Sequence, residues 1–92
     1  MNKSVFYVSA ISDPDAVAER IKELIPDEND RYELVDGQWF VVFEGISRTL
    51  AEKLSIRGEP HISTGIVLPV MSYSGRAEPS LWEWLNKQMN RQ

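Results

Sequence analysis

Apolar and polar residues alternate on both sides of Asp36-Gly37, and this is the clearest structural pattern in the chain. Asp-Gly between two β-rich runs is typical of a two-residue hairpin turn of type I′, in which both loop residues have positive φ. The two runs therefore predict a pair of antiparallel strands. The expected register pairs Val35 with Gln38, Leu34 with Trp39, Glu33 with Phe40 and Tyr32 with Val41.

With that register the hairpin has two unlike faces, because successive side chains of a strand point to opposite sides of the sheet. The apolar face, which we expect in the core, carries Tyr32, Leu34, Trp39, Val41 and Phe43. The mixed face carries Arg31, Glu33, Val35, Gln38, Phe40, Val42 and Glu44. Because the mixed face is half apolar, a third helix, a ligand or a partner must cover part of it.

The remaining apolar periodicity predicts two more strands and three helices. Ser12-Asp13-Pro14-Asp15 is typical of a helix start and Pro26 of a helix end, and Ser80 lies at capping-box spacing from Glu83. Gly65 and Pro69 interrupt the last strand, which indicates a bulge or an edge position. The expected elements outside the hairpin are a strand over 4–10, a helix over 14–25, a shorter helix over 46–57 followed by Gly58, a strand over 62–70 and a helix over 79–90.

This order of elements is βαββαβ followed by a helix, and it predicts an α+β fold within a single domain spanning residues 1–92. We expect the ferredoxin-like split βαβ arrangement, with four mostly antiparallel strands backed by two helices. The additional C-terminal helix, at about 79–90, would then lie outside that arrangement.

Composition narrows the classes of protein that fit. Cysteine is absent, which excludes disulfides, thiolate zinc sites and a cysteine nucleophile. No apolar run approaches the roughly 18 residues that a membrane-spanning helix needs, and the N-terminal stretch is too short for a secretory signal. We therefore expect a soluble, cytoplasmic protein that does not contact membranes.

The charges are unevenly distributed along the chain. Residues 13–44 hold ten acidic and three basic residues, whereas the remainder carries a net charge of +3. The acidic segment could be an ordinary solvated surface, or it could meet a basic partner or a second copy of the chain. In the second case we expect solvent-directed acids such as Glu19, Glu23 and Asp27 to form the interface.

The second hairpin strand resembles the RNP1 motif of the RNA-recognition motif family at Gly37, Phe40, Val41 and Phe43. Three neighbouring positions depart from that motif. Asp36 stands where it has Lys or Arg, Gln38 replaces its first stacking aromatic residue, and Trp39 occupies its small position. Because an acid at the leading position would repel phosphate, nucleic acid is not an expected partner.

Candidate ligand-binding chemistry is sparse. The turn Tyr73-Ser74-Gly75-Arg76 joins a strand end to a helix start, where backbone N–H groups and an arginine can hold a carboxylate or a phosphate. A pocket between the sheet and the C-terminal helix would be lined by Phe40, Trp82, Tyr73, Arg76 and His61. No residue is expected to be catalytic, and neither a metal nor a cofactor is expected.

The C-terminal helix carries two tryptophans whose side chains lie about 200° apart around the helix axis. Trp82 and Trp84 cannot both face one surface fully, so we expect one of them to pack and the other to be half-exposed or to meet a partner. A helix laid on the open sheet face could instead use the edges of both rings.

These observations favour a small, non-catalytic binding or regulatory domain that acts through protein–protein contacts. These contacts would include those between two copies of the chain in a homodimer. An acidic inhibitor or immunity-type protein is one version of this hypothesis. The alternative is a small-molecule or anion sensor, or a small enzyme, with its pocket between the sheet and the C-terminal helix.

Overall fold

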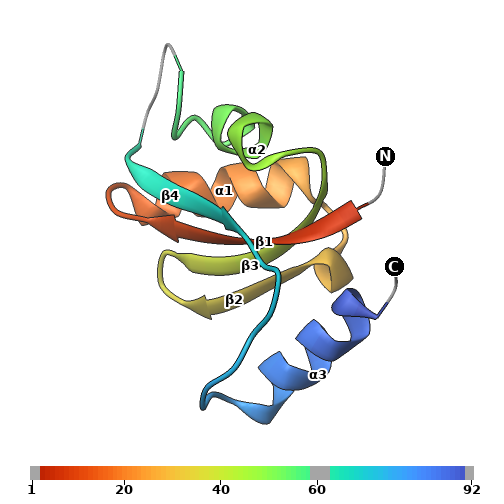
Figure 1. Cartoon of the computed structure of the whole chain (residues 1–92). Helices are drawn as coiled ribbons and strands as arrows, with labels where there is room; N and C mark the ends of the chain where they lie inside the picture. The colour runs from red at the N-terminus through yellow and green to blue at the C-terminus, as the bar shows by residue number, and fades with distance from the viewer. Residues whose placement is uncertain (1–2, 59–62, 91–92) are drawn as a thin grey trace.

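The computed structural model describes residues 3–58 and 63–90 and shows an α+β fold built on one antiparallel sheet (Figure 1). The strand order is β2-β3-β1-β4. The α+β class and the three helices agree with the sequence prediction. In chain order the elements are β1 (Lys3–Ala10), α1 (Pro14–Leu24), the 3₁₀ turn η1 (Glu28–Asp30), β2 (Arg31–Val35), β3 (Gln38–Glu44), α2 (Ser47–Lys53), β4 (Gly65–Pro69) and α3 (Pro79–Met89).

Helices α1 and α2 cover one face of the sheet and bury the larger apolar cluster. Val17 and Ile21 of α1 and Leu50 of α2 are completely buried there. The sheet contributes alternate residues of β1 and β3 to the same cluster, namely Phe6, Val8, Trp39 and Val41. The prediction that Trp39, Val41 and Phe43 share a core face of β3 is therefore confirmed.

Helix α3 covers part of the opposite face, on the other side of the sheet from α1 and α2 (Figure 1). Leu81 and Leu85 of α3 are 3% and 1% exposed and pack with Val5 of β1 and Val42 of β3. The sequence predicted that a third helix, a ligand or a partner covers part of the mixed face of the hairpin. In the structure a third helix, α3, lies there.

The hairpin register differs from the prediction beyond its first pair. Val35 pairs with Gln38 as expected, but Glu33 pairs with Trp39 and Tyr32 with Phe40, because the strand shifts by one residue between Glu33 and Val35. Tyr32 and Leu34 consequently pack on the α3 side of the sheet, not in the larger core. The faces assigned to these two residues from the sequence were wrong.

The turn conformation explains this shift. Gly37 has φ of +82°, whereas Asp36 is not among the residues with positive φ, so the turn is not of type I′. Turns of types I and II, whose first central residue has negative φ, splay the two strands, and a β-bulge restores the twist by adding one residue on one strand. The turn is also fixed from outside, since the Ala10 N–H donates to the Gly37 carbonyl at 2.7 Å.

Polar residues expected to cap helices bond to other segments instead. Ser12 Oγ accepts a hydrogen bond from the Thr64 N–H at 2.9 Å, and Asp13, the N-cap of α1, makes no side-chain cap bond. Ser80 shares a 2.7 Å hydrogen bond with the Tyr32 hydroxyl. Helix α2 ends at Lys53 and not at Arg57, where the sequence predicted its end. Ser55, just beyond the observed end, has a φ of +60°.

We predict that Gly37→Val lowers the free energy of unfolding by about 1–3 kcal/mol, because a β-branched residue is strained at positive φ. A Cβ atom at this position would also lie 3.3 Å from the Ala10 carbonyl oxygen. Urea unfolding measures the effect. Asp36→Ala is the control, since Asp36 lacks the positive φ, and an equal loss in both variants would contradict the explanation.

We predict that Leu85→Ala lowers the free energy of unfolding by about 2–5 kcal/mol, because this side chain is buried against the sheet of its own chain. The exposed Glu83 on the same helix is the control, and Glu83→Ala should change stability by less than about 0.5 kcal/mol. Unfolding is measured at two protein concentrations. A midpoint that rises with concentration would place α3 on a neighbouring copy and contradict the arrangement.

Candidate functional site

Strand β4 forms an edge of the sheet, and within the described residues it pairs only with β1. The Val70 N–H donates to the Val5 carbonyl at 2.9 Å, and the Ile11 N–H donates to the Thr64 carbonyl at 2.8 Å. Because alternate residues of an antiparallel strand bond to the same neighbour, Gly65, Val67 and Pro69 direct their backbone groups away from β1. Of the two alternatives that the sequence left open for this strand, a bulge or an edge position, the structure contains the edge position.

The two residues that marked the edge in the sequence have distinct structural reasons. Proline at an outward-directed position removes no hydrogen bond from the ladder to β1, so Pro69 is tolerated there. Gly65 allows the close approach of the two strands, because a Cβ atom at this position would lie 2.6 Å from the Ser9 carbonyl oxygen.

The side chains of β4 are uncharged and present apolar surface on both faces. Val67 is half-buried and packs toward α2, against the larger core. Ile66 and Leu68 point to the opposite face, at a part that α3 does not cover, and they are 47% and 50% exposed.

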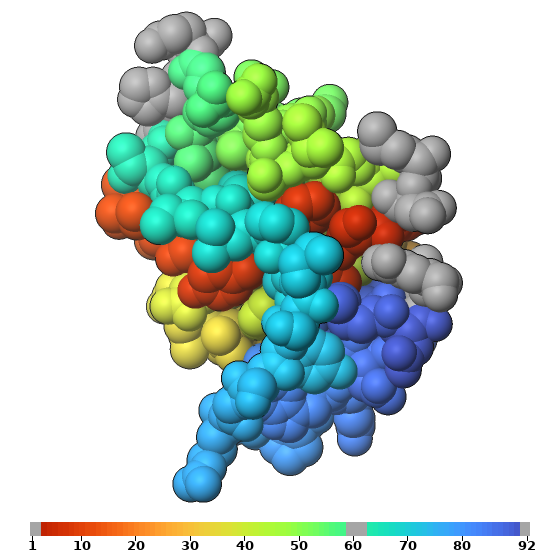
Figure 2. Space-filling model, viewed as in Figure 1, coloured from red at the N-terminus to blue at the C-terminus, as the bar shows by residue number. Residues whose placement is uncertain are grey.

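A groove of about 410 Å³ runs between the outer edge of β4 and α2. Figure 2 shows the β4 segment at the surface of the molecule, next to the segment that contains α2. The residues that line the groove are Ser47, Arg48, Ala51, Ile56, Arg57, Gly65 and Val67. Its two charged side chains, Arg48 and Arg57, are exposed and make no ion pair with any residue from 3–58 or 63–90. The groove is therefore electropositive.

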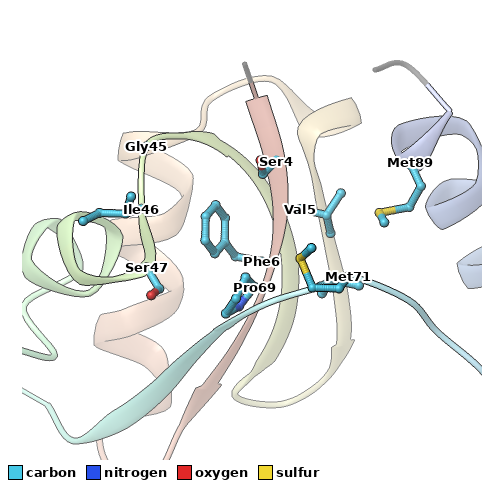
Figure 3. Close-up of a pocket in the computed structure, with 10 residues that line it drawn as sticks. Ser4, Val5, Phe6, Gly45, Ile46, Ser47, Pro69, Met71 and Met89 are labelled. Carbon is cyan, nitrogen blue, oxygen red and sulfur yellow. The ribbon is translucent and has the colours of Figure 1, made fainter. Parts of the chain in front are cut away.

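An apolar hollow of about 420 Å³ continues from this groove, where β4 turns away from β1. Ser47 lines both. In Figure 3, Ile46 and Ser47 stand on one side of the hollow and Met89 of α3 on the other, with Phe6 and Met71 between them. Met71 lines the hollow and is 84% exposed, so its apolar side chain also reaches the outer surface beside the hollow.

The opposite edge of the sheet, β2, has a different character. Its ladder to β3 is broken by the shift between Glu33 and Val35, and the exposed acids Glu33 and Asp36 flank that shift. Bulges and charged side chains are the devices by which edge strands avoid pairing with other chains. Strand β4 has neither a bulge nor a charged side chain, although Pro69 offers no N–H group at its outward position. Gly65 and Val67 are therefore the outward positions of β4 that keep both backbone groups for a further strand.

The residues predicted to bind a ligand are not brought into one cluster by the contacts observed. The Tyr73 ring stacks on Trp82, with ring centroids 5.7 Å apart, whereas Phe40 packs against Tyr7 at 5.3 Å. Arg76 is exposed, and His61 lies outside the described residues. A ligand site formed by these four residues stays a prediction.

Both tryptophans predicted at an interface have partners within the chain. Trp84 lies 6.1 Å from the Tyr32 ring, and its Nε1 donates to the Asn29 carbonyl at 2.9 Å. Trp82 is half-buried beside Tyr73. Both rings thus pack against the cluster between α3 and the sheet. Their part in an interface stays a prediction.

The three acidic residues predicted at an interface are exposed and lie on two elements. Glu19 and Glu23 are exposed on α1. Asp27 is exposed at the start of η1, where its Oδ1 accepts from the Asn29 N–H at 2.9 Å. Their part in partner binding stays a prediction.

Sequence reasoning did not single out Arg48, Arg57, Ile66 and Leu68. The available signals were the basic excess after residue 44 and the two strand interruptions, but only the fold places these residues around one edge.

Other kinds of site find no support in the part of the chain that the structure describes. Residues 3–58 and 63–90 contain no group of three or more His, Cys, Asp or Glu side chains that could hold a metal ion. Among the same residues, no helix is long and apolar enough to cross a membrane. No protein-family model, curated protein or solved structure matches this chain.

Proposed function

We propose that this protein is a non-catalytic binding domain that takes an extended segment of a partner protein as an additional strand along β4. In such strand addition, main-chain hydrogen bonds supply affinity and the flanking side-chain surfaces supply specificity. The outward backbone groups of Gly65 and Val67 would form the new ladder.

The observation that carries this proposal is the contrast between the two sheet edges. Strand β2 has a bulge and flanking acids, whereas β4 has no charged residue and borders two hollows. An unpaired edge strand with exposed apolar side chains is prone to pairing with other chains. If the protein is a binding domain, the segment of the partner pairs with β4 and covers this edge.

The chemistry along the edge suits binding better than catalysis. The groove offers two guanidinium groups, one hydroxyl group and aliphatic carbon, and the adjoining hollow offers methionine, phenylalanine and isoleucine side chains. Guanidinium groups bind carboxylates, and an apolar hollow of this size receives a large side chain.

We further propose that the fold is the ferredoxin-like split βαβ arrangement with an additional helix. Two features support this assignment. The antiparallel order is β2-β3-β1-β4, and the crossover helices α1 and α2 both contribute to the cluster on one face. On that assignment α3 is the addition that covers the second face.

Strand addition is tested by removing one outward N–H group from β4. Val67→Pro deletes that donor and leaves the bonds to β1 in place, and Val67→Ala is the matched control that loses side-chain packing but keeps the donor. Peptides selected against the wild-type protein from a random display library are synthesised, and their affinities are measured by fluorescence anisotropy. We expect the selected peptides to bind Val67→Pro at least about tenfold more weakly than Val67→Ala, since a lost ladder bond leaves its partner unsatisfied.

A second measurement avoids any effect of the substitution on folding. Two sets of peptides are methylated on the backbone nitrogens of alternate residues, one set at the odd positions and the other at the even positions. Each set loses the N–H donors along one edge of the peptide strand only. The set methylated along the edge that faces β4 should lose binding, while the other set retains it. Equal binding of both methylated sets, together with equal binding to both Val67 variants, would overturn the proposal.

A further inference from the structure

We infer that the segment that pairs with β4 alternates acidic and apolar residues, with its acidic side chains toward α2. This inference rests on the proposed function and specifies the partner's chemistry. It follows from the different surfaces that border β4 on the two faces of the sheet.

The α2 side of the added strand faces positive charge. Arg48 and Arg57 are the charged side chains that line the groove, and they are without ion-pair partners among the described residues. Carboxylates on the partner would supply those partners, since guanidinium and carboxylate form charge-assisted hydrogen bonds. Basic residues at the same positions would meet like charge and be excluded.

The other side of the added strand faces exposed apolar carbon. Ile66 and Leu68 lie on the face away from α2 and are about half-exposed. Side chains directly opposite one another on neighbouring strands lie about 5 Å apart, so β-branched residues on the partner would cover both.

These two surfaces impose a period of two on the partner. Alternate side chains of a strand point to opposite faces, so acids at every second position reach the groove while the residues between them pack on Ile66 and Leu68. A block of acids followed by a block of apolar residues has the same composition but places charge against apolar carbon.

The chain's own β2 segment is a poorer occupant than a segment of another protein. It carries one acid, Glu33, between aromatic and aliphatic residues, and its ladder is interrupted by the shift between Glu33 and Val35. Pairing of β2 with β4 of a second copy would also be a head-to-tail contact, which forms a ring or an open filament and not a two-fold dimer.

Four fluorescent seven-residue peptides with blocked termini test the pattern. They are the alternating Glu/Val sequence, the same sequence with Lys for Glu, the same sequence with Gln for Glu, and the Glu/Val composition arranged in two blocks. We expect the alternating acidic peptide to bind about tenfold more tightly than each of the other three in fluorescence anisotropy at low salt.

The charge contact is tested by reversing the charge of the groove. Arg48→Glu combined with Arg57→Glu should weaken the acidic peptide and strengthen the lysine peptide, so that the order of affinities inverts. Lys22→Glu combined with Lys87→Glu is the matched control, because it changes the net charge equally at exposed positions outside the groove. The control should leave the order unchanged.

The outcomes separate this inference from the proposed function. Equal affinity for the acidic and lysine peptides, or an order that the groove variant leaves unchanged, overturns the inference. If library-selected peptides still bind Val67→Pro more weakly than Val67→Ala, strand addition stands without this inference. If they bind both variants equally and both methylated sets also bind equally, the proposed function falls as well. A dimer in sedimentation that Val67→Pro abolishes would assign the edge to a second copy and also overturn the inference.

Discussion

The burial of β1 on both faces is the constraint on which the layered arrangement depends. Phe6 and Val8 pack toward α1 and α2 and Val5 packs toward α3, and all three are at most 3% exposed. Strands pair with both edges of β1. Leaving either face of β1 in water would forfeit roughly 1.5–3 kcal/mol of burial for each of these large apolar side chains. The chain therefore requires a cover on each side of the sheet.

The position of the second cover determines what remains open. Hydrogen bonds hold helix α3 near the β2 edge of the sheet. Trp84 Nε1 and Gln88 Nε2 both donate to the Asn29 carbonyl at 2.9 Å, and Ser80 Oγ shares a hydrogen bond with the Tyr32 hydroxyl. All of these contacts lie on η1 or β2. The helix accordingly shields Val42 and Val5 but not Ile66 and Leu68 on β4. Exposed apolar surface and an unpaired strand edge thus occur on the same strand.

The local pattern predicted most of the fold, since each strand and helix has an apolar period that can be read within a few residues. It failed where a distant segment changed a local preference. Ser12, a good helix cap, bonds to Thr64 instead, and the turn at Gly37 is held by Ala10 in a conformation that introduces a bulge. That bulge moved Tyr32 and Leu34 to the other face, and alternation alone contains no sign of it.

The candidate site was less predictable than the fold. Pro69 and Gly65 indicated an edge, because proline and glycine have recognisable positions in sheets. Arg48 and Arg57 belong to the segment after β3, and in the sequence they look like ordinary solvated charges. Only the crossover from β3 through α2 to β4 brings them alongside Gly65 and Val67. Because the residues of this site come from segments that only the folded chain brings together, no local sequence pattern marks the site.

The register of β1 has a consequence for the order of events during synthesis. Val8 pairs with Trp39 on one side and with Val67 on the other, so the strand that is made first completes its pairing only after some sixty further residues have followed. Contacts between residues so distant in the chain form slowly, and unpaired apolar strands are prone to aggregation while they wait. A nascent chain of this protein therefore keeps one edge of β1 unpaired until β4 has left the ribosome, and this is the interval in which a chaperone has the most to protect.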